Sequence, residues 1–310
     1  MQIAHADQVM ASVTSGQAAA RSRIAASWQR CFARHRLDPA ARCAPVIHAG
    51  RLSDRRDALE RLLRVAAPPL EDLHRMIAHS GRAIFLTDSD GLVLAGCLRS
   101  ADAEDFARAG LCAGTDWSEA AQGTNGIGTC LAEEKPLTVH RDQHYLAENI
   151  GMSCIDAPVF GPDGRLVAAL DVSSVRSGEE AGFNALIGGM VTRIAAQIEA
   201  ALFRDAHAGL RIVLGDEAGG AALLAVDRDE LVVGATRAAR RQFRLERSGA
   251  FAPVPLRDLT GEAAQGLAGA ERAVVMRALA RAGGNVSAAA RDLGLGRATL
   301  YRRMRRLGID

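Results

Sequence analysis

The chain has few aromatic residues and almost no lysine. Aromatic residues make up 4% of its 310 positions, and Lys135 is its single lysine. Leu, Val, Ile and Ala must therefore fill the hydrophobic cores, within a chain that is 48% hydrophobic and 24% charged. This composition is typical of a folded globular protein and excludes a disordered one.

The scarcity of lysine also excludes a phosphate-binding loop. Such a loop needs Gly-Lys-Ser/Thr, whereas Lys135 stands in Glu-Glu-Lys-Pro. The glycines from Gly123 to Gly128 have the wrong order for a dinucleotide fingerprint, and no long strand precedes them. We therefore predict no nucleotide cofactor and no other cofactor.

Three further absences concern the cellular setting. The N-terminus, MQIAHADQVMASV, lacks the basic start and the long apolar core of a secretory signal. No run approaches the roughly 18 apolar residues of a membrane span. The six cysteines (31, 43, 97, 112, 130 and 154) show no Cys-x-x-Cys spacing. We expect a cytoplasmic protein with reduced thiols and without a membrane partner.

Catalytic motifs are missing as well. The sequence contains neither a Gly-x-Ser-x-Gly elbow nor His-Glu-x-x-His. Asp88, Asp90 and Asp163 occur in turns, where short carboxylate side chains bond the backbone. We therefore predict that the protein is not an enzyme.

What is present is an uneven distribution of charge. From residue 271 onward there are nine arginines and three acidic residues, a net charge of +6. Because the whole chain carries +2, residues 1–270 carry −4. A basic end on an acidic body indicates that only the end has a polyanionic partner.

The basic end has the apolar spacing of three helices. We expect them over 271–282, 286–293 and 297–307, with Gly283-Gly284 ending the first and Asn285 or Ser287 capping the second. On the third, Leu300, Met304 and Leu307 face inward. The arginines left on its outer side are Arg297, Arg302, Arg303, Arg305 and Arg306.

Two helices joined by a short glycine turn, the second of them basic, predict a helix-turn-helix in the major groove of DNA. Arginine reads guanine edges there and also binds phosphates. The alternative is a solvated Arg-rich helix from a GC-rich genome. It is disfavoured because no glutamate follows Arg297.

Upstream, the pattern changes from helical to strand-like at residue 82. Helical spacing covers residues 22–35 and 54–80, where Pro68-Pro69 is expected to interrupt the second helix. Strand-turn-strand units follow over 83–96 and 153–174, with a short strand over 137–140 and a long helix over 183–204. Residues 222–243 read as strand, turn, strand and helix.

These patterns predict an α+β protein with an all-α end. We expect a helical leader over 1–80, an antiparallel sensor domain over 81–207, a small unit over 208–251, a linker over 252–270, and a helix-turn-helix domain over 271–310.

The last segment resembles a known family. GGNVSAAARDLGLGRATLYRRMRRLGI, residues 283–309, is similar to the Fis-type helix-turn-helix that ends many bacterial enhancer-binding regulators. The likeness implies that Arg297, Thr299, Arg302 and Arg303 contact DNA. It also implies that Asn285 and Ser287 approach the DNA backbone.

The resemblance continues upstream. SRIAASWQRC, LTDSDGLVL, WSEAAQGTNGIGTCLAEEKPLTVHRDQHY and SCIDAPVFGPDGRLVAALDVSS resemble the N-terminal half of acetoin-catabolism-regulator-like proteins over residues 21–205. The likeness implies a GAF-like sensor and a shortened PAS-like segment after it. Those regulators carry a AAA+ ATPase ahead of the helix-turn-helix, and here about 15 residues stand in its place.

A GAF-like domain implies a pocket for an unidentified small effector. The candidate lining residues are Trp117, Thr124, Asn125, Thr129, Cys130, His140, His144, Cys154 and Asp156. The alternative is a structural role, in which Asn125 bonds its own loop and the two cysteines belong to the core. Two further alternatives are a metal site at His140, His144 and Cys154, with Cys130 possible as a fourth ligand, and a thiol switch. The strand expected at 137–140 weakens the metal spacing.

Together these features predict a transcription regulator that binds an inverted repeat in double-stranded DNA as a homodimer. The 183–204 helix would serve as the dimer and coupling element, and an effector would shift the population of dimer arrangements. The rival is an adaptor that works with a separate AAA+ activator of RNA polymerase. An architectural DNA-bending protein is a third option, disfavoured because such a protein has nothing to sense.

Overall fold

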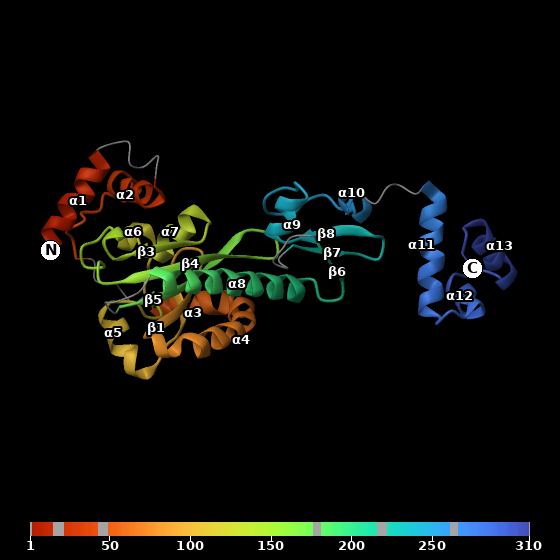
Figure 1. Cartoon of the computed structure of the whole chain (residues 1–310), viewed down its shortest axis with the longest axis horizontal. Coiled ribbons are helices and arrows are strands. Elements are labelled where there is room, and N and C mark those ends of the chain that lie inside the picture. Colours follow the sequence, from red (N-terminus) through yellow and green to blue (C-terminus); the bar gives the residue numbers. More distant parts are fainter. Residues whose placement is uncertain are drawn as a thin grey trace. The chain divides into compact units, whose positions relative to one another are not determined.

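The computed structural model describes residues 2–14, 22–42, 49–175, 181–215, 222–260 and 266–309. They divide into two compact units, Met1–Ala252 and Pro253–Asp310 (Figure 1). Each unit is considered below by itself.

A five-stranded antiparallel sheet forms the centre of the first unit, in the order β2-β1-β5-β4-β3. The strands are β1 (Arg82–Thr87), β2 (Val93–Cys97), β3 (Leu137–His140), β4 (Ser153–Phe160) and β5 (Leu166–Ser174). In the β1–β2 turn, the Asp88 carboxylate accepts hydrogen bonds from the backbone N–H groups of Asp90 and Leu92. Both predicted hairpins and the predicted role of Asp88 are confirmed.

Helices α4 (Glu60–Ile77) and α8 (Ala181–Ala206) cover one face of this sheet (Figure 1). Helix α3 (Ala49–Ala58) precedes them and packs beside β2. The buried side chains between these helices and the sheet are Leu, Ile, Val and Ala, without an aromatic residue among the described members. This is the aliphatic core that the composition predicts.

Helix α4 runs through Pro68 and Pro69, so the expected interruption is wrong. Pro68 is exposed and Pro69 only half-buried, whereas Ala66, Leu70 and Leu73 are buried in the core. Two prolines cost the helix backbone hydrogen bonds. The apolar stripe on both sides of them packs against the same sheet, and this burial keeps the helix continuous.

Helix α8 is the one helix in the described ranges that is long and apolar enough to cross a membrane by length and composition. This corrects the expectation that no segment approaches such a composition. Its residues Ile187, Val191 and Ile198 are buried between the sheet and α4. Packing within the domain therefore accounts for its apolar character.

Short helices and loops cover the opposite face of the sheet. They are α5 (Ala103–Arg108), α6 (Glu119–Gln122) and α7 (Gly126–Glu133), and their apolar cluster includes Phe85, Phe106, Trp117, Cys130 and Cys154. Helices α1 (Gln2–Thr14) and α2 (Arg23–Ala33) pack near these loops through Trp28, Tyr145 and their neighbours. The sequence analysis did not anticipate α1.

A smaller antiparallel sheet follows α8. Strands β6 (Arg211–Leu214), β7 (Leu223–Val226) and β8 (Leu231–Ala235) pair in that order, and helix α9 (Arg237–Gln242) comes next. The predicted strand, turn, strand and helix are confirmed. Strand β6 is an additional element.

The second unit is helical apart from the two-residue strand β9 (Val254–Pro255). Its helices are α10 (Leu256–Thr260), α11 (Gly266–Arg281), α12 (Val286–Asp292) and α13 (Arg297–Arg306). The last three enclose a core that contains Val275, Ala289, Leu300 and Met304, which confirms the three predicted helices. Helix α10 and the start of α11 lie within residues 252–270, which the sequence analysis assigned to a linker.

Candidate functional site

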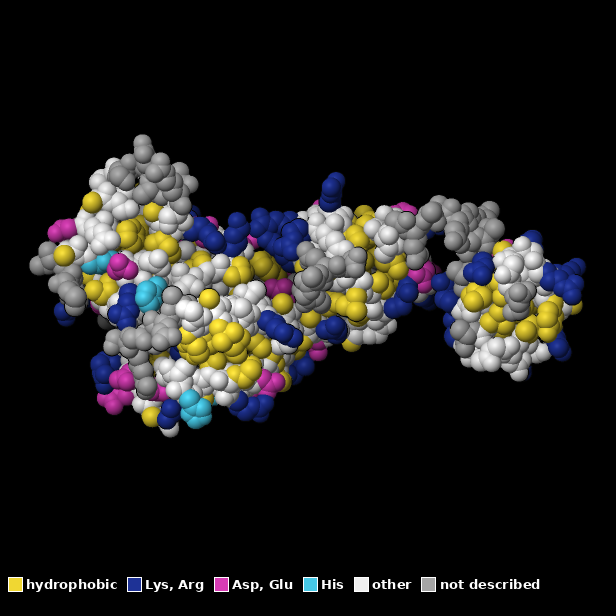
Figure 2. Space-filling model, in the orientation of Figure 1, with side chains coloured by type: hydrophobic (Ala, Val, Ile, Leu, Met, Phe, Trp, Pro, Cys, Tyr) yellow, Lys and Arg dark blue, Asp and Glu magenta, His cyan; other side chains and the backbone are white. Residues whose placement is uncertain are grey.

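Helix α13 presents a basic open face. Leu300 and Met304 are buried against α11 and α12, while Arg297, Arg302 and Arg305 are exposed. In the part of the chain that the structure describes, no ion pair engages these three guanidinium groups. Figure 2 shows basic side chains around the periphery of this unit.

Arg303 and Arg306 differ from those three because an acidic partner reaches them. Glu271 of α11 pairs with Arg306, and its other carboxylate oxygen lies 3.2 Å from Nη1 of Arg303. The predicted contact residue Arg303 therefore faces α11, and its charge is partly balanced. Arg305, absent from the predicted contact set, takes the open position one turn from Arg302.

The remaining predicted contacts lie at helix starts. Oδ1 of Asn285 accepts hydrogen bonds from the backbone N–H groups of Ser287 and Ala288, at 3.0 and 3.1 Å. Asn285 is thus the cap of α12, one of the two alternatives that the sequence left open. Ser287 and Thr299 are half-buried on their helices. Their contact with DNA stays a prediction.

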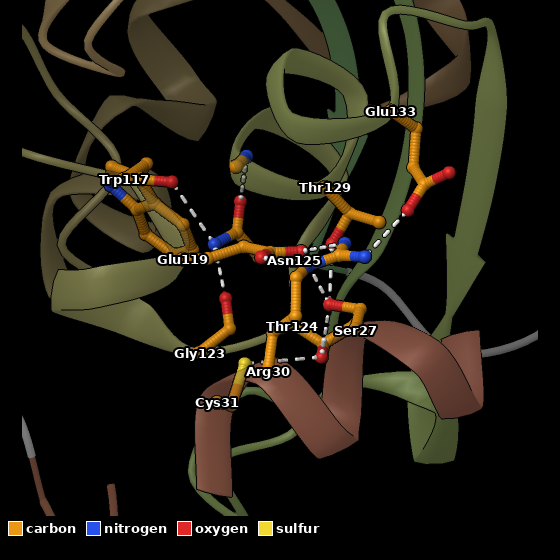
Figure 3. Close-up of polar contacts among 11 residues, drawn as sticks. Ser27, Arg30, Cys31, Trp117, Glu119, Gly123, Thr124, Asn125, Thr129 and Glu133 are labelled. Carbon is orange, nitrogen blue, oxygen red and sulfur yellow. Dashed lines mark hydrogen bonds and ion pairs between the residues drawn. The ribbon is translucent and has the colours of Figure 1, made fainter. Parts of the chain in front are cut away.

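In the first unit, the glycine-rich loop is built around Asn125 (Figure 3). Its Oδ1 accepts a hydrogen bond from Gly128 N, and its Nδ2 donates to the carbonyl oxygens of Trp117 and Gly123. Asn125 is fully buried. A side chain at Gly126 would collide with Asp156, so the loop also requires glycine there. The structural alternative therefore accounts for Asn125.

The two threonines of the loop bind helix α2. Oγ of Ser27 lies 2.6 Å from Oγ1 of Thr124 and 3.2 Å from Oγ1 of Thr129, and it donates to Glu119 (Figure 3). Arg30, one turn further along α2, donates two hydrogen bonds to the buried Glu119 carboxylate, at 2.8 and 2.9 Å. Sequence reasoning missed Ser27 and Arg30. Their spacing of three on a helix was the available signal.

Replacing Arg30 by alanine should release α2 from the loop. Glu119 is 6% exposed and would lose its only ion-pair partner in the described structure, which costs about 3 kcal/mol for a buried pair. We expect faster amide exchange in α2 and a lower midpoint of urea unfolding. Arg34→Ala is the matched control, because Arg34 is exposed at the end of the same helix. Equal exchange rates in both variants would contradict this role.

Trp117, Cys130 and Cys154 join the apolar cluster on the loop-covered face. The indole N–H of Trp117 donates to the carbonyl oxygen of Gly110. Burial raises the pKa of the Cys130 and Cys154 thiols well above the ordinary value. A high thiol pKa disfavours the reactive thiolate, which weakens the thiol-switch alternative.

The two histidines bracket a short turn and do not share a helix face. Nδ1 of His140 lies 2.7 Å from Oγ of Ser153, while Nε2 of the buried His144 lies 3.5 Å from Sγ of Cys154. Burial lowers the pKa of His144 to about 4, so its ring is neutral. Within the described residues, no three side chains of the metal-binding types converge on one point. The geometry thus gives the metal alternative no support.

Asp156 is paired with a second buried carboxyl group. It faces Asp171 directly across strands β4 and β5, and both side chains are inaccessible to solvent. Ser173 donates a hydrogen bond to Asp171 Oδ1, whereas both oxygens of Asp156 and Oδ2 of Asp171 lack a hydrogen-bond partner. Burial raises the pKa of Asp171 to about 7 and that of Asp156 well above its usual range. Sequence reasoning missed Asp171, although an aspartate in a buried strand is itself a signal.

A cavity of about 350 Å³ lies at the edge of this face. Gln122, Asn149 and Met152 are among its lining residues, and Nδ2 of the buried Asn149 lacks a hydrogen-bond partner. None of the nine predicted effector residues lines this cavity. Met152 connects it to the apolar cluster that contains Trp117.

Comparison with known proteins places both units among regulatory domains. Residues 61–202 match the GAF domain family, and residues 267–307 match the bacterial regulatory protein Fis family. Over 231 residues the chain is 32% identical to the acetoin catabolism regulatory protein of Cupriavidus necator, covering 72% of this chain and 35% of that protein. It is also 32% identical over 163 residues to the acetoin dehydrogenase operon transcriptional activator AcoR of Bacillus subtilis, covering 52% of this chain and 27% of that protein.

The chain therefore spans about a third or less of the length of these curated relatives. Among solved structures, the E. coli DhaR(N)–DhaL complex is similar, with a TM-score of 0.54 and 17% identity. The similarity covers 74% of this chain and 78% of that one. At this identity it concerns the fold alone.

Proposed function

Since this chain combines a GAF domain with a Fis-family helix-turn-helix and is related to the acetoin catabolism regulatory proteins, we propose that it binds specific DNA sequences and controls transcription in response to a small molecule. The observation that carries the proposal is the open basic face of α13. We further propose that the protein is cytoplasmic and not an enzyme.

The DNA-binding step uses α13 in the major groove. Arg302 and Arg305 lie one helical turn apart on its exposed side, so both guanidinium groups reach the same stretch of duplex. Bidentate arginine contacts to guanine provide sequence discrimination, and contacts to phosphates position the helix. Two copies of the domain on an inverted repeat require half-sites about 34 Å apart, which a homodimer satisfies.

Helix α8 offers the surface for such a dimer. Its buried stripe faces the sheet, yet Leu186 remains 61% exposed and Phe183 41% exposed, and Met76 of α4 is 60% exposed. Large exposed apolar side chains on neighbouring helices favour a contact with another protein surface. We propose that this surface meets a second copy of the chain.

The sensing step takes place on the loop-covered face of the GAF domain. The 350 Å³ cavity is of a size that holds a small molecule, and Asn149 offers an unused amide donor in it. An uncharged polar effector suits this cavity better than a strong anion, because the buried Asp156 and Asp171 lie on the same face of the sheet. A ligand that prefers one dimer arrangement shifts the population by its differential affinity.

A second candidate function is that of an adaptor. The similar E. coli fragment DhaR(N) was solved in a complex with another protein, DhaL. A sensor of this fold is therefore compatible with a protein partner, and a separate AAA+ activator of RNA polymerase is the partner that we consider here. Under this alternative, promoter recognition depends on that activator.

Sequencing of genomic DNA fragments captured by the purified full-length protein separates the two functions. The regulator should enrich a shared inverted repeat without any other protein. The adaptor should enrich no motif alone, and should enrich one only after addition of a AAA+ activator from the same genome. Failure to enrich a motif under either condition would contradict both.

A further inference from the structure

A second and larger cavity lies outside the loop-covered face. It measures about 720 Å³ and is bounded by β4, α8, the loop between α7 and β3, and helix α9 with the residues after it. All of these elements belong to the first unit. In Figure 2, basic side chains gather along the edge of this unit where Figure 1 places α9.

The groove exists because the edge of the large sheet is incomplete. Strand β3 begins at Leu137, which pairs with Asp156, so the rest of β4 has no neighbouring strand on that side. The N–H of Phe160 instead donates a hydrogen bond of 3.0 Å to Glu199 of α8. The floor is apolar and consists of Ala157, Pro158, Phe160, Ala195 and Ala196.

Cations dominate the walls of the groove. They are Lys135, Arg237, Arg240, Arg241, Arg244 and Arg247, against two acidic residues, Glu134 and Glu199. Glu134 already pairs with Arg237 and Arg247. Burial raises the pKa of Glu199 to about 7, which reduces its charge further. Lys135 and Arg244 are exposed on the rim, and no acidic partner engages them in the described residues.

Some of the arginines are fixed in place. The Arg237 guanidinium lies 4.3 Å from the centre of the Phe160 ring, and its Nη1 donates to the carbonyl oxygen of Gly164. The buried Arg240 donates to the carbonyl oxygens of Ala235, Glu246 and Gly249. One wall of the groove is therefore held rigid, which lowers the entropy lost on binding.

We propose that this groove binds a small organic anion, with its apolar body over Phe160 and the alanines of α8 and its anionic head between Lys135 and Arg244. The head is a phosphate or a pair of carboxylates, because both are dianions that arginine and lysine recognise. The concave shape and the volume are those of a small-molecule site. A ligand here joins the GAF sheet to α9 and stabilises the packing between them.

This site is separate from the effector cavity of the proposed function. The two cavities share no lining residue. Binding in the groove is therefore measured without DNA, and its outcome does not depend on whether the chain recognises a promoter.

Calorimetric titration of the full-length protein with phenyl phosphate and with phthalate tests the proposal. We expect saturable binding of at least one of them, and the tighter of the two identifies the head group. The variant Lys135→Gln/Arg244→Gln should bind at least about tenfold more weakly. Arg204→Gln/Arg228→Gln removes two exposed cations that are not among the groove-lining residues, and it should bind like the unmodified protein.

A second readout uses the single lysine of the chain. The bound anion should slow acetylation of Lys135 by an amine-reactive reagent, as measured by mass spectrometry. Three results would overturn the proposal: no saturable binding of either anion, equal losses in the two double variants, or full reactivity of Lys135 at saturation. Inorganic phosphate that binds as tightly as phenyl phosphate would refute the contact with the apolar floor.

Discussion

Replacing Arg302 and Arg305 together by alanine should reduce affinity for the operator by about 100-fold or more. Both guanidinium groups are exposed on the open face of α13, and neither is in an ion pair in the described structure. Each contributes about 1–3 kcal/mol if it reads a base, and a phosphate contact adds to the salt dependence. Fluorescence anisotropy over a salt series should show a weaker complex and a salt slope smaller by about two contacts.

Two comparisons make this result specific. Arg75→Ala/Arg108→Ala removes the same charge from exposed positions in the first unit, and should leave operator affinity nearly unchanged. Arg303→Ala should cost less than Arg302→Ala, because Glu271 already engages Arg303. If the Arg302/Arg305 variant bound the operator as tightly as the unmodified protein, α13 would not be the recognition helix.

Replacing Asp171 by asparagine should stabilise the first unit at alkaline pH. The pKa of Asp171 rises from 3.8 to about 7 in the folded protein, because the group is buried, and the neighbouring carboxyl of Asp156 is raised with it. Between these two pH values the folded state binds more protons than the unfolded state, so the free energy of unfolding falls as pH rises. Asparagine has no proton to lose. At pH 8 we expect a gain on the order of 1–3 kcal/mol, and little change near pH 4.

Tryptophan fluorescence during urea unfolding measures this effect in the relevant unit, because Trp28 and Trp117, the two tryptophans of the chain, both belong to it. The difference between variant and unmodified protein removes the parallel contribution of Glu199, whose pKa is raised in the same direction. Asp72→Asn serves as the control, since the Asp72 side chain is 59% exposed. An unchanged pH dependence in Asp171→Asn would contradict the assignment.

The helix-turn-helix was predictable because its information is local. The glycines after Ala282 and Leu293 end helices, Asn285 is a short polar cap, and Leu300 and Met304 recur at helical spacing. The hairpins of the sensor were predictable for a related reason, since Asp88 and its following glycine encode a turn without help from distant residues. In each case, neighbouring residues determine the backbone conformation.

Other features depend on residues far apart in the chain. The sequence suggested that Pro68-Pro69 would break a helix, yet burial on one sheet keeps α4 continuous. Thr124 and Thr129 read as ligand contacts, whereas Ser27, almost a hundred residues away, engages them. Glu271 turns Arg303 toward α11 across a similarly unforeseeable contact.

The sequence alone thus determined the order of the elements and the basic, DNA-facing character of the last helix, because periodicity and turn residues act over a few positions. Only the tertiary structure decided which polar side chains are already engaged and where cavities remain. Pairs such as Asp156 with Asp171, and the groove between β4 and α9, arise from strand register and packing between distant segments, and no local pattern records them.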